Sequence, residues 1–82
     1  MDSNVIVYTQ KNCQPCAATK RALKKNNIPF EEIESTDAIR EELRLEGWLS
    51  FPIVKVLNGA GKPVESWSGY RLERIKALGG SN

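Results

Sequence analysis

The sequence contains no histidine, one methionine and only two cysteines among its 82 residues. A structural zinc site needs four ligands, usually cysteine and histidine, so a single cysteine pair predicts no metal site within one chain. No apolar run approaches the roughly 20 residues that cross a bilayer, which argues against a membrane protein. The N-terminal residues also lack a basic region followed by an apolar stretch, so we expect the protein in the cytoplasm.

The charge balance is nearly even, with 12 basic against 10 acidic residues and a net charge of +2. Its distribution is less even, because positions 11–25 carry five basic residues and no acid, whereas positions 31–46 carry seven acids and two arginines. Two solvated helix faces of opposite sign account for this pattern more simply than a patch that steers an acidic partner. The basic cluster has no interleaved aromatic residues, so nucleic-acid binding is not expected.

Hydrophobic periodicity and turn signals predict seven elements in the order β-α-β-α-β-β-α. The predicted strands cover residues 4–9, 28–34, 51–57 and 63–68, and the predicted helices run from 15 to about 26, from 36 or 37 onward, and from about 70 to 78. Helical spacing predicts the core-facing positions of the first and last helices, which are Ala18, Ala22, Leu23, Leu72, Ile75 and Leu78. The Asn58-Gly59 pair suits a hairpin turn between the last two strands. A β-α-β unit followed by a hairpin and a helix predicts an α/β fold with a mixed four-stranded sheet and three helices. We expect one domain over residues 1–78 and a tail over 79–82.

Both cysteines lie three positions apart, where the first helix is predicted to begin. The free backbone N–H groups and the positive end of the helix dipole favour a thiolate at Cys13. C-x-x-C motifs at helix starts lower the pKa of the attacking thiol from about 8.5 to between roughly 3.5 and 7.5. Cys13 is therefore predicted to attack disulfides, and Cys16 to resolve the mixed disulfide. Pro15 suits the first helical turn, where its missing N–H costs nothing.

The cysteine pair could also serve structure or bind a metal cluster. A disulfide that closes so short a loop constrains the unfolded chain very little and would stabilise the fold little. Two copies of the chain could instead share an iron–sulfur cluster between their cysteine pairs, and this alternative stays open. Lys11, Lys20 and Arg21 either add positive charge near Cys13 or extend into water.

The chain resembles the glutaredoxin-type members of the thioredoxin fold and, among these, the NrdH-redoxins. Residues 8–23, YTQKNCQPCAATKRAL, are similar to their active-site strand, loop and helix start, and residues 67–75, WSGYRLERI, to their W-S-G-F/Y-R-x-x-x-I segment. The resemblance implies a cis Pro52 opposite the cysteines, with the Phe51 backbone aimed at an incoming peptide. The residues then expected to contact a partner are Lys11, Gln14, Pro15, Phe51, Pro52, Trp67, Ser68, Gly69 and Tyr70.

Some positions depart from the family patterns or stay ambiguous. Glutaredoxins usually carry Gly-Gly and then an acidic or hydroxyl residue, and the acid helps to hold the ammonium group of glutathione. In this chain Arg71 would place a positive charge beside that ammonium group, so glutathione should bind poorly. NrdH-redoxins more often have glutamine directly before the second cysteine, where this chain has proline, so the redox potential stays open between about −270 and about −200 mV. The side chains of Phe51 and Trp67 each suit either the core or a contact surface.

The sequence therefore predicts a small dithiol electron carrier that reduces protein disulfides. By resemblance, the electron acceptor is a class Ib ribonucleotide reductase, and the electron donor is thioredoxin reductase drawing on NADPH. The protein is expected to work as a monomer without a bound cofactor. The alternative within redox chemistry is a glutathione-dependent glutaredoxin. The alternative of another class is an iron–sulfur carrier assembled across a dimer.

Overall fold

The computed structural model describes residues 4–79, which form the predicted succession of strands and helices. The elements are β1 (Val5–Thr9), α1 (Gln14–Lys25), β2 (Glu31–Glu34), α2 (Asp37–Leu45), β3 (Ile53–Leu57), β4 (Pro63–Ser68) and α3 (Leu72–Gly79). Of the predicted tail, Gly79 is the last residue of α3, and residues 80–82 lie outside the described residues. Within residues 4–79, no helix combines the length and the apolar character needed to cross a membrane.

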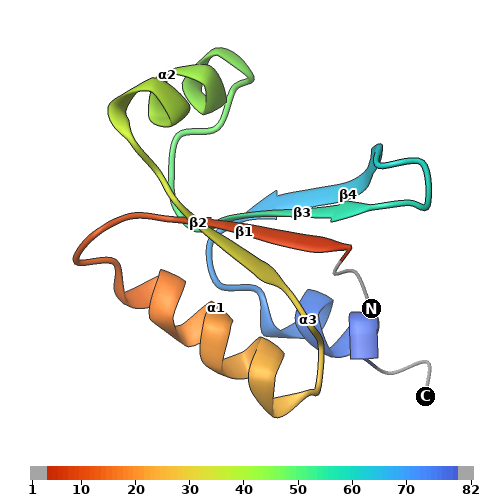
Figure 1. Ribbon diagram of the computed structural model, residues 1–82. Coiled ribbons are helices and arrows are strands. Elements are labelled where there is room, and N and C mark those ends of the chain that lie inside the picture. The colour runs from red at the N-terminus through yellow and green to blue at the C-terminus, as the bar shows by residue number, and fades with distance from the viewer. Residues whose placement is uncertain (1–3, 80–82) are drawn as a thin grey trace.

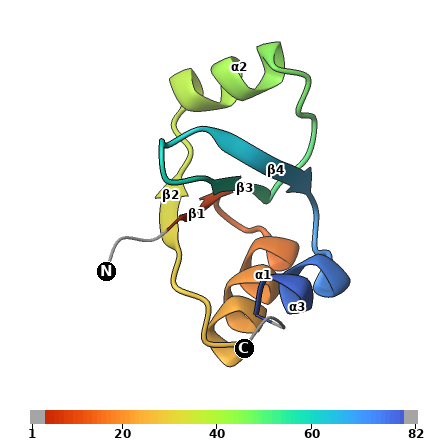
Figure 2. The same ribbon diagram turned by 90° about the vertical axis from the view of Figure 1, so that its right-hand side faces the viewer.

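The four strands form one mixed sheet in the order β2-β1-β3-β4 (Figure 1). β1 pairs parallel with β2 and antiparallel with β3, and β3 pairs antiparallel with β4. The helix α1 supplies the crossover that the two parallel strands need. Figures 1 and 2 show α1 and α3 on one face of the sheet and α2 on the other. The predicted thioredoxin fold is confirmed.

The main core lies between the sheet and the layer formed by α1 and α3. Along β1, buried and half-buried residues alternate, and the side chains of Val5 and Val7 join this core. Leu23 of α1, Val54 of β3 and Ile75 of α3 meet them and are completely buried. The inward positions predicted from helical spacing in α1 and α3 are therefore confirmed at Leu23 and Ile75.

Two helices begin at side chains that accept hydrogen bonds from free backbone N–H groups. Thr36 caps α2, and its Oγ1 accepts a hydrogen bond from the Ile39 N–H at 3.2 Å. Cys13 caps α1, as predicted, and Pro15 lies in the first turn. Just beyond α1, Asn27 has a φ of +59°, a left-handed conformation that asparagine tolerates and that turns the chain toward β2.

The hairpin between β3 and β4 differs from its prediction. The left-handed residue is Gly61, with a φ of +81°, and not Gly59 of the predicted turn pair. The Asn58 side-chain oxygen accepts hydrogen bonds from the backbone N–H groups of Ala60 at 2.8 Å and Lys62 at 3.0 Å. The Asn58 side chain thus takes the place of a backbone acceptor, and the loop that it holds is longer than a two-residue turn.

Three other elements start two or more residues later than predicted. β3 begins at Ile53, after the cis bond between Phe51 and Pro52. β2 begins at Glu31, because residues 28–30 approach the core as a loop before the strand pairing with β1 starts. α3 begins at Leu72 and not at Tyr70. The cause is Gly69, whose φ of +83° turns the chain between β4 and the helix.

Candidate active site

The cysteine pair lies at the N-terminus of α1, in the loop that leaves the sheet after β1. Asn12 has a φ of +56°, and this left-handed conformation turns the loop into the helix. The Cys13 Sγ accepts a hydrogen bond from the backbone N–H of Cys16 at 3.2 Å. A disulfide joins the two sulfurs, and the two Cα atoms lie 5.2 Å apart. The structure therefore shows the predicted pair in its oxidised form at the positive end of a helix.

The two cysteines differ in how far a partner can reach them. Cys13 is half-buried, whereas Cys16 is only 2% exposed. This difference supports Cys13 as the sulfur that an incoming molecule meets first. Among the described residues, no three histidine, cysteine, aspartate or glutamate side chains gather closely enough to hold a metal ion.

A second loop faces the cysteines because β1 and β3 are antiparallel neighbours. Tyr8, near the end of β1, pairs with Ile53 at the start of β3, so the loop after β1 and the loop before β3 emerge at the same edge of the sheet. The peptide bond between Phe51 and Pro52 is cis, as the resemblance implied. The backbone N–H and carbonyl of Phe51 form no hydrogen bond with another residue in the range 4–79.

The segment after β4 holds this second loop. Ser68 pairs with Ile53, and one step further the Gly69 N–H donates a hydrogen bond to the Pro52 carbonyl at 2.8 Å. The hydroxyl oxygens of Ser50 and Ser68 lie 3.4 Å apart. Ser68 and Gly69, predicted to line the site, therefore support the loop that lines it.

The aromatic residues predicted for the site have three different environments. Trp67 is 4% exposed and belongs to the main core, with the Arg74 guanidinium 5.6 Å from its ring centre. Its packing supports the role of a core anchor and not that of a contact surface. Phe51 is half-buried and lines a hollow that also reaches Cys13. Tyr70 is 44% exposed and lies next to Gln14 and Pro15, where a second, shallower hollow begins.

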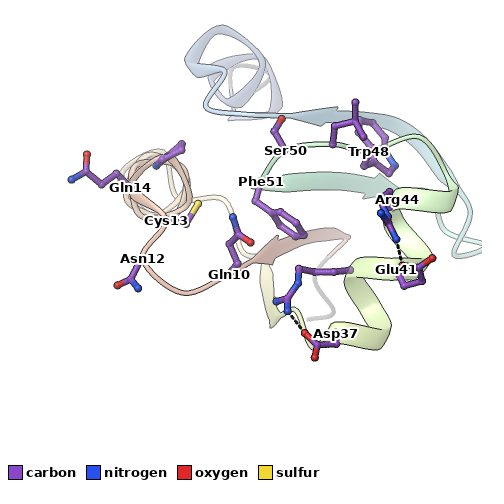
Figure 3. Close-up of a pocket in the computed structure, with 13 residues that line it drawn as sticks. Gln10, Asn12, Cys13, Gln14, Asp37, Glu41, Arg44, Trp48, Ser50 and Phe51 are labelled. Carbon is purple, nitrogen blue, oxygen red and sulfur yellow. Dashed lines mark hydrogen bonds and ion pairs between the residues drawn. The ribbon is translucent and has the colours of Figure 1, made fainter.

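The hollow beside Cys13 measures about 740 Å³ and separates the cysteine loop from α2. Figure 3 shows Cys13 and Gln10 on one side, Phe51 in the middle, and Asp37, Glu41 and Arg44 of α2 on the other side. The α2 charges pair with each other, Arg40 with Asp37 and Arg44 with Glu41. This wall is consequently close to neutral.

Sequence patterns did not mark the α2 wall or the segment that follows α2 as parts of the site. The charged residues of α2 repeat as they do on any solvated helix face, so nothing in their pattern indicates a site. Leu45 and Leu49 carry a clearer signal in the structure, because these large apolar side chains are 79% and 86% exposed. Leu49 also lines the hollow beside Phe51. Only the fold shows that such leucines are not buried.

A polar crevice lies on the other side of the disulfide and is lined by both cysteines. There the Lys20 ammonium lies 2.9 Å from Glu32 Oε2, and the Thr9 hydroxyl donates to the same oxygen at 3.0 Å. The hydrogen bond from Lys20 is the main cause that lowers the pKa of Glu32 below its ordinary value of 4.5, against the opposing effect of desolvation. Lys20 is thus neutralised by a partner, while Lys11 is exposed to water.

Comparison with known proteins agrees with this geometry. The glutaredoxin family model matches residues 5–60. The chain is 34% identical over 77 residues to the glutaredoxin-like protein NrdH of Salmonella typhimurium strain LT2, covering 92% of this chain and 88% of that protein. The chain belongs to the NrdH group of glutaredoxin-like proteins. As a member of this group it is a thiol–disulfide oxidoreductase that acts as a redox carrier through its cysteine pair.

Solved structures show the same relationship. The NrdH-redoxin from Escherichia coli, described as having a thioredoxin-like activity profile, superposes with a TM-score of 0.76 at 34% identity, covering 90% of this chain and 92% of that one. A thioredoxin-like protein superposes with a TM-score of 0.71 at 32% identity, covering 90% and 97%. The NrdH-type protein described here therefore shares its relatives' fold over almost its whole length.

Proposed function

We propose that this NrdH-type protein carries electrons from thioredoxin reductase to the disulfide of a partner protein, and that this partner is a class Ib ribonucleotide reductase. The observation that carries the proposal is the accessible Cys13 beside a loop whose Phe51 backbone has no hydrogen-bond partner among residues 4–79. An extended peptide can pair with such a backbone and so bring its disulfide to the cysteines. We expect the carrier to act as a monomer in the cytoplasm.

The reaction uses only the two thiols of the reduced protein. The Cys13 thiolate attacks one sulfur of the partner disulfide, forming a mixed disulfide and releasing the other partner sulfur as a thiolate that takes up a proton. Cys16 then loses its proton and attacks the Cys13 sulfur. This step forms the Cys13–Cys16 disulfide and releases the second partner thiol. Two electrons have passed from the cysteine pair to the partner, leaving the oxidised state seen in the structure.

Arg71 supports thioredoxin reductase and not glutathione as the electron donor. Arg71 directly precedes α3, its side chain is 53% exposed, and its guanidinium lies 3.9 Å from the Glu73 carboxylate. By the resemblance, glutathione-binding glutaredoxins use this region to hold an ammonium group, which a cation at Arg71 repels. The thioredoxin-like activity profile described for the Escherichia coli NrdH-redoxin points the same way.

The proposal is tested by a disulfide-reduction assay with two electron sources in parallel. One reaction contains NADPH and thioredoxin reductase, and the other contains NADPH, glutathione and glutathione reductase. Turnover with the first source alone is the expected result. Turnover chiefly with the second would identify a glutathione-dependent glutaredoxin and overturn the role given to Arg71. Adding a class Ib ribonucleotide reductase as the acceptor then tests the partner.

A further inference from the structure

A groove between α1 and α3 gathers positive charge that the redox reaction does not use. The two helices lie side by side under the sheet (Figures 1 and 2). Between them is a hollow of about 720 Å³ lined by Arg21, Lys24 and Lys25 of α1 and by Lys76 of α3. Within the described part of the chain, no acidic residue lines it. The fold thus brings a cation from the far end of the sequence next to the basic cluster of the first helix.

Most of these cations are not neutralised by the protein itself. Arg21, Lys25 and Lys76 form no ion pair within residues 4–79, and Lys24 only influences Glu32 at a distance. Elsewhere the protein pairs its arginines, as α2 does within its own first and last turns. Four cations around one concave surface create a positive potential that a single exposed lysine does not.

The groove is continuous with the redox centre. A shallow hollow lined by Gln14, Pro15, Arg21 and Tyr70 connects the two. Gln14 and Pro15 also line the hollow beside Cys13, whereas Arg21 and Tyr70 also line the basic groove. A chain held at Cys13 can therefore follow the surface past Tyr70 into the groove.

We propose that this basic groove binds an acidic segment of the partner protein whose disulfide Cys13 exchanges, an inference that rests on the proposed function. The molecule bound at Cys13 is a protein, and the groove begins where that protein is already held. An acidic peptide complements the four cations without needing stacked rings. A single-stranded nucleic acid would need several stacking side chains, and among the described residues that line the groove only Tyr70 is aromatic.

Helix geometry gives the position of the acidic segment in the partner. Arg21 and Lys25 lie eight and twelve residues after Cys13, which is about 12 and about 18 Å along a helix that rises about 1.5 Å per residue. An extended chain covers roughly 3.3 Å per residue. The acidic residues should therefore lie about four to six positions from the partner's reacting cysteine.

The test uses the reduced, full-length protein and disulfide peptides of equal length with capped ends. In one peptide the positions four to six residues from the cysteine are glutamate, and in the matched peptide they are glutamine. Each peptide is made in two versions, one with this segment before the cysteine and one with it after the cysteine. The second-order rate constant of exchange is measured at low salt and again in concentrated sodium chloride. We expect one glutamate peptide to react about fivefold to tenfold faster than its glutamine match at low salt, and salt to abolish the difference.

Charge reversals locate the effect. The Arg21→Glu/Lys76→Glu variant should lose the preference for glutamate, and Lys76→Glu alone should lose part of it. Lys62→Glu is the matched control, because Lys62 is also exposed and without an ion pair in the described chain but lies in the β3–β4 hairpin. It should keep the preference. Circular dichroism checks that each variant is folded.

The outcomes separate this inference from the proposed function. If the wild-type protein reduces neither peptide, the proposed function fails. If it reduces the glutamine peptide but gains nothing from glutamate in either position, the groove assignment alone is wrong. An equal loss in the Lys62→Glu control would also overturn it, because net charge would then account for the preference. The groove assignment would also be overturned if an oligothymidylate inhibited exchange at concentrations where polyglutamate of equal charge has no effect.

Discussion

Gly69 offers the sharpest test of how the active site is held together. Its φ of +83° lies in the left-handed region, and its N–H donates a hydrogen bond to the Pro52 carbonyl at 2.8 Å. A Cβ added at this position would meet no heavy atom within 4 Å. The substitution Gly69→Ala should therefore act through the backbone conformation and not through a clash.

The expected cost follows from this conformation. An L-residue in the left-handed region loses about 1–2 kcal/mol relative to glycine, and in a domain of this size about 1 kcal/mol lowers the melting temperature by roughly 4–8 °C. Gly61 provides a matched control. Its φ is +81°, its N–H donates to the Asn58 carbonyl at 2.9 Å, and a Cβ there also meets nothing within 4 Å. Gly61→Ala should lose the same stability.

The two variants should differ in activity. In Gly69→Ala, relief of the backbone strain shifts the hydrogen bond that fixes Pro52, so the loop that receives the partner peptide moves. Gly61 lies in the β3–β4 hairpin, away from the cysteines. We expect the rate of disulfide-peptide reduction to fall about tenfold or more in Gly69→Ala, because small misplacements of a reacting pair are costly. In Gly61→Ala the rate should stay near that of the wild type. Thermal unfolding and single-turnover kinetics measure both effects. Equal activity of the two variants would refute the positioning role of Gly69.

Three further predictions concern individual side chains. Cys16→Ser should trap partner disulfides on Cys13, because no second thiol resolves them; mass spectrometry that finds no mixed disulfide would contradict the assigned order. Arg71→Asp should raise glutathione-driven turnover severalfold, and an unchanged rate would mean that shape and not charge excludes glutathione. The lowered pKa of Glu32 means that its pairing with Lys20 stabilises the fold above pH 4.5 and that this stability is lost as the pH falls through the lowered pKa. Since both side chains are partly exposed, Glu32→Gln should cost only about 0.2–1 kcal/mol at pH 7 in urea unfolding. The cost should shrink as the pH falls through the lowered pKa, and a cost independent of pH would contradict the pairing.

Sequence patterns predicted the features that depend on local chemistry. The place of Cys13 at the helix cap followed from a strand ending just before it and a helical pattern starting just after it. The buried positions of Leu23 and Ile75 followed from helical spacing. The cis bond before Pro52 did not follow from any local signal, since cis prolines are uncommon, and was expected only from family resemblance.

Features that depend on distant contacts could not be predicted in this way. From the sequence, Trp67 suited either the core or a contact surface, and in the structure the packing of α3 against the sheet buries it. Asn58-Gly59 matched the usual hairpin-turn pattern, but the Asn58 side chain holds a longer loop in which Gly61, and not Gly59, is left-handed. Lys76 lies far along the sequence from the basic cluster of α1, and only the contact of α1 with α3 brings it there.

The register of the sheet explains why three distant segments form one site. Tyr8 and Ser68 both pair with Ile53, so β1 delivers the cysteine loop and β4 delivers Gly69 to the same end of β3. The hydrogen bond from Gly69 to Pro52 is the next step of the β3–β4 pairing beyond the strands. A slip of β4 by one residue along β3 would turn Trp67 out of the core, while Val54 stays paired with Val7 of β1. Because core burial forbids that slip, the same apolar residues that stabilise the fold also hold the peptide-binding loop opposite the cysteines.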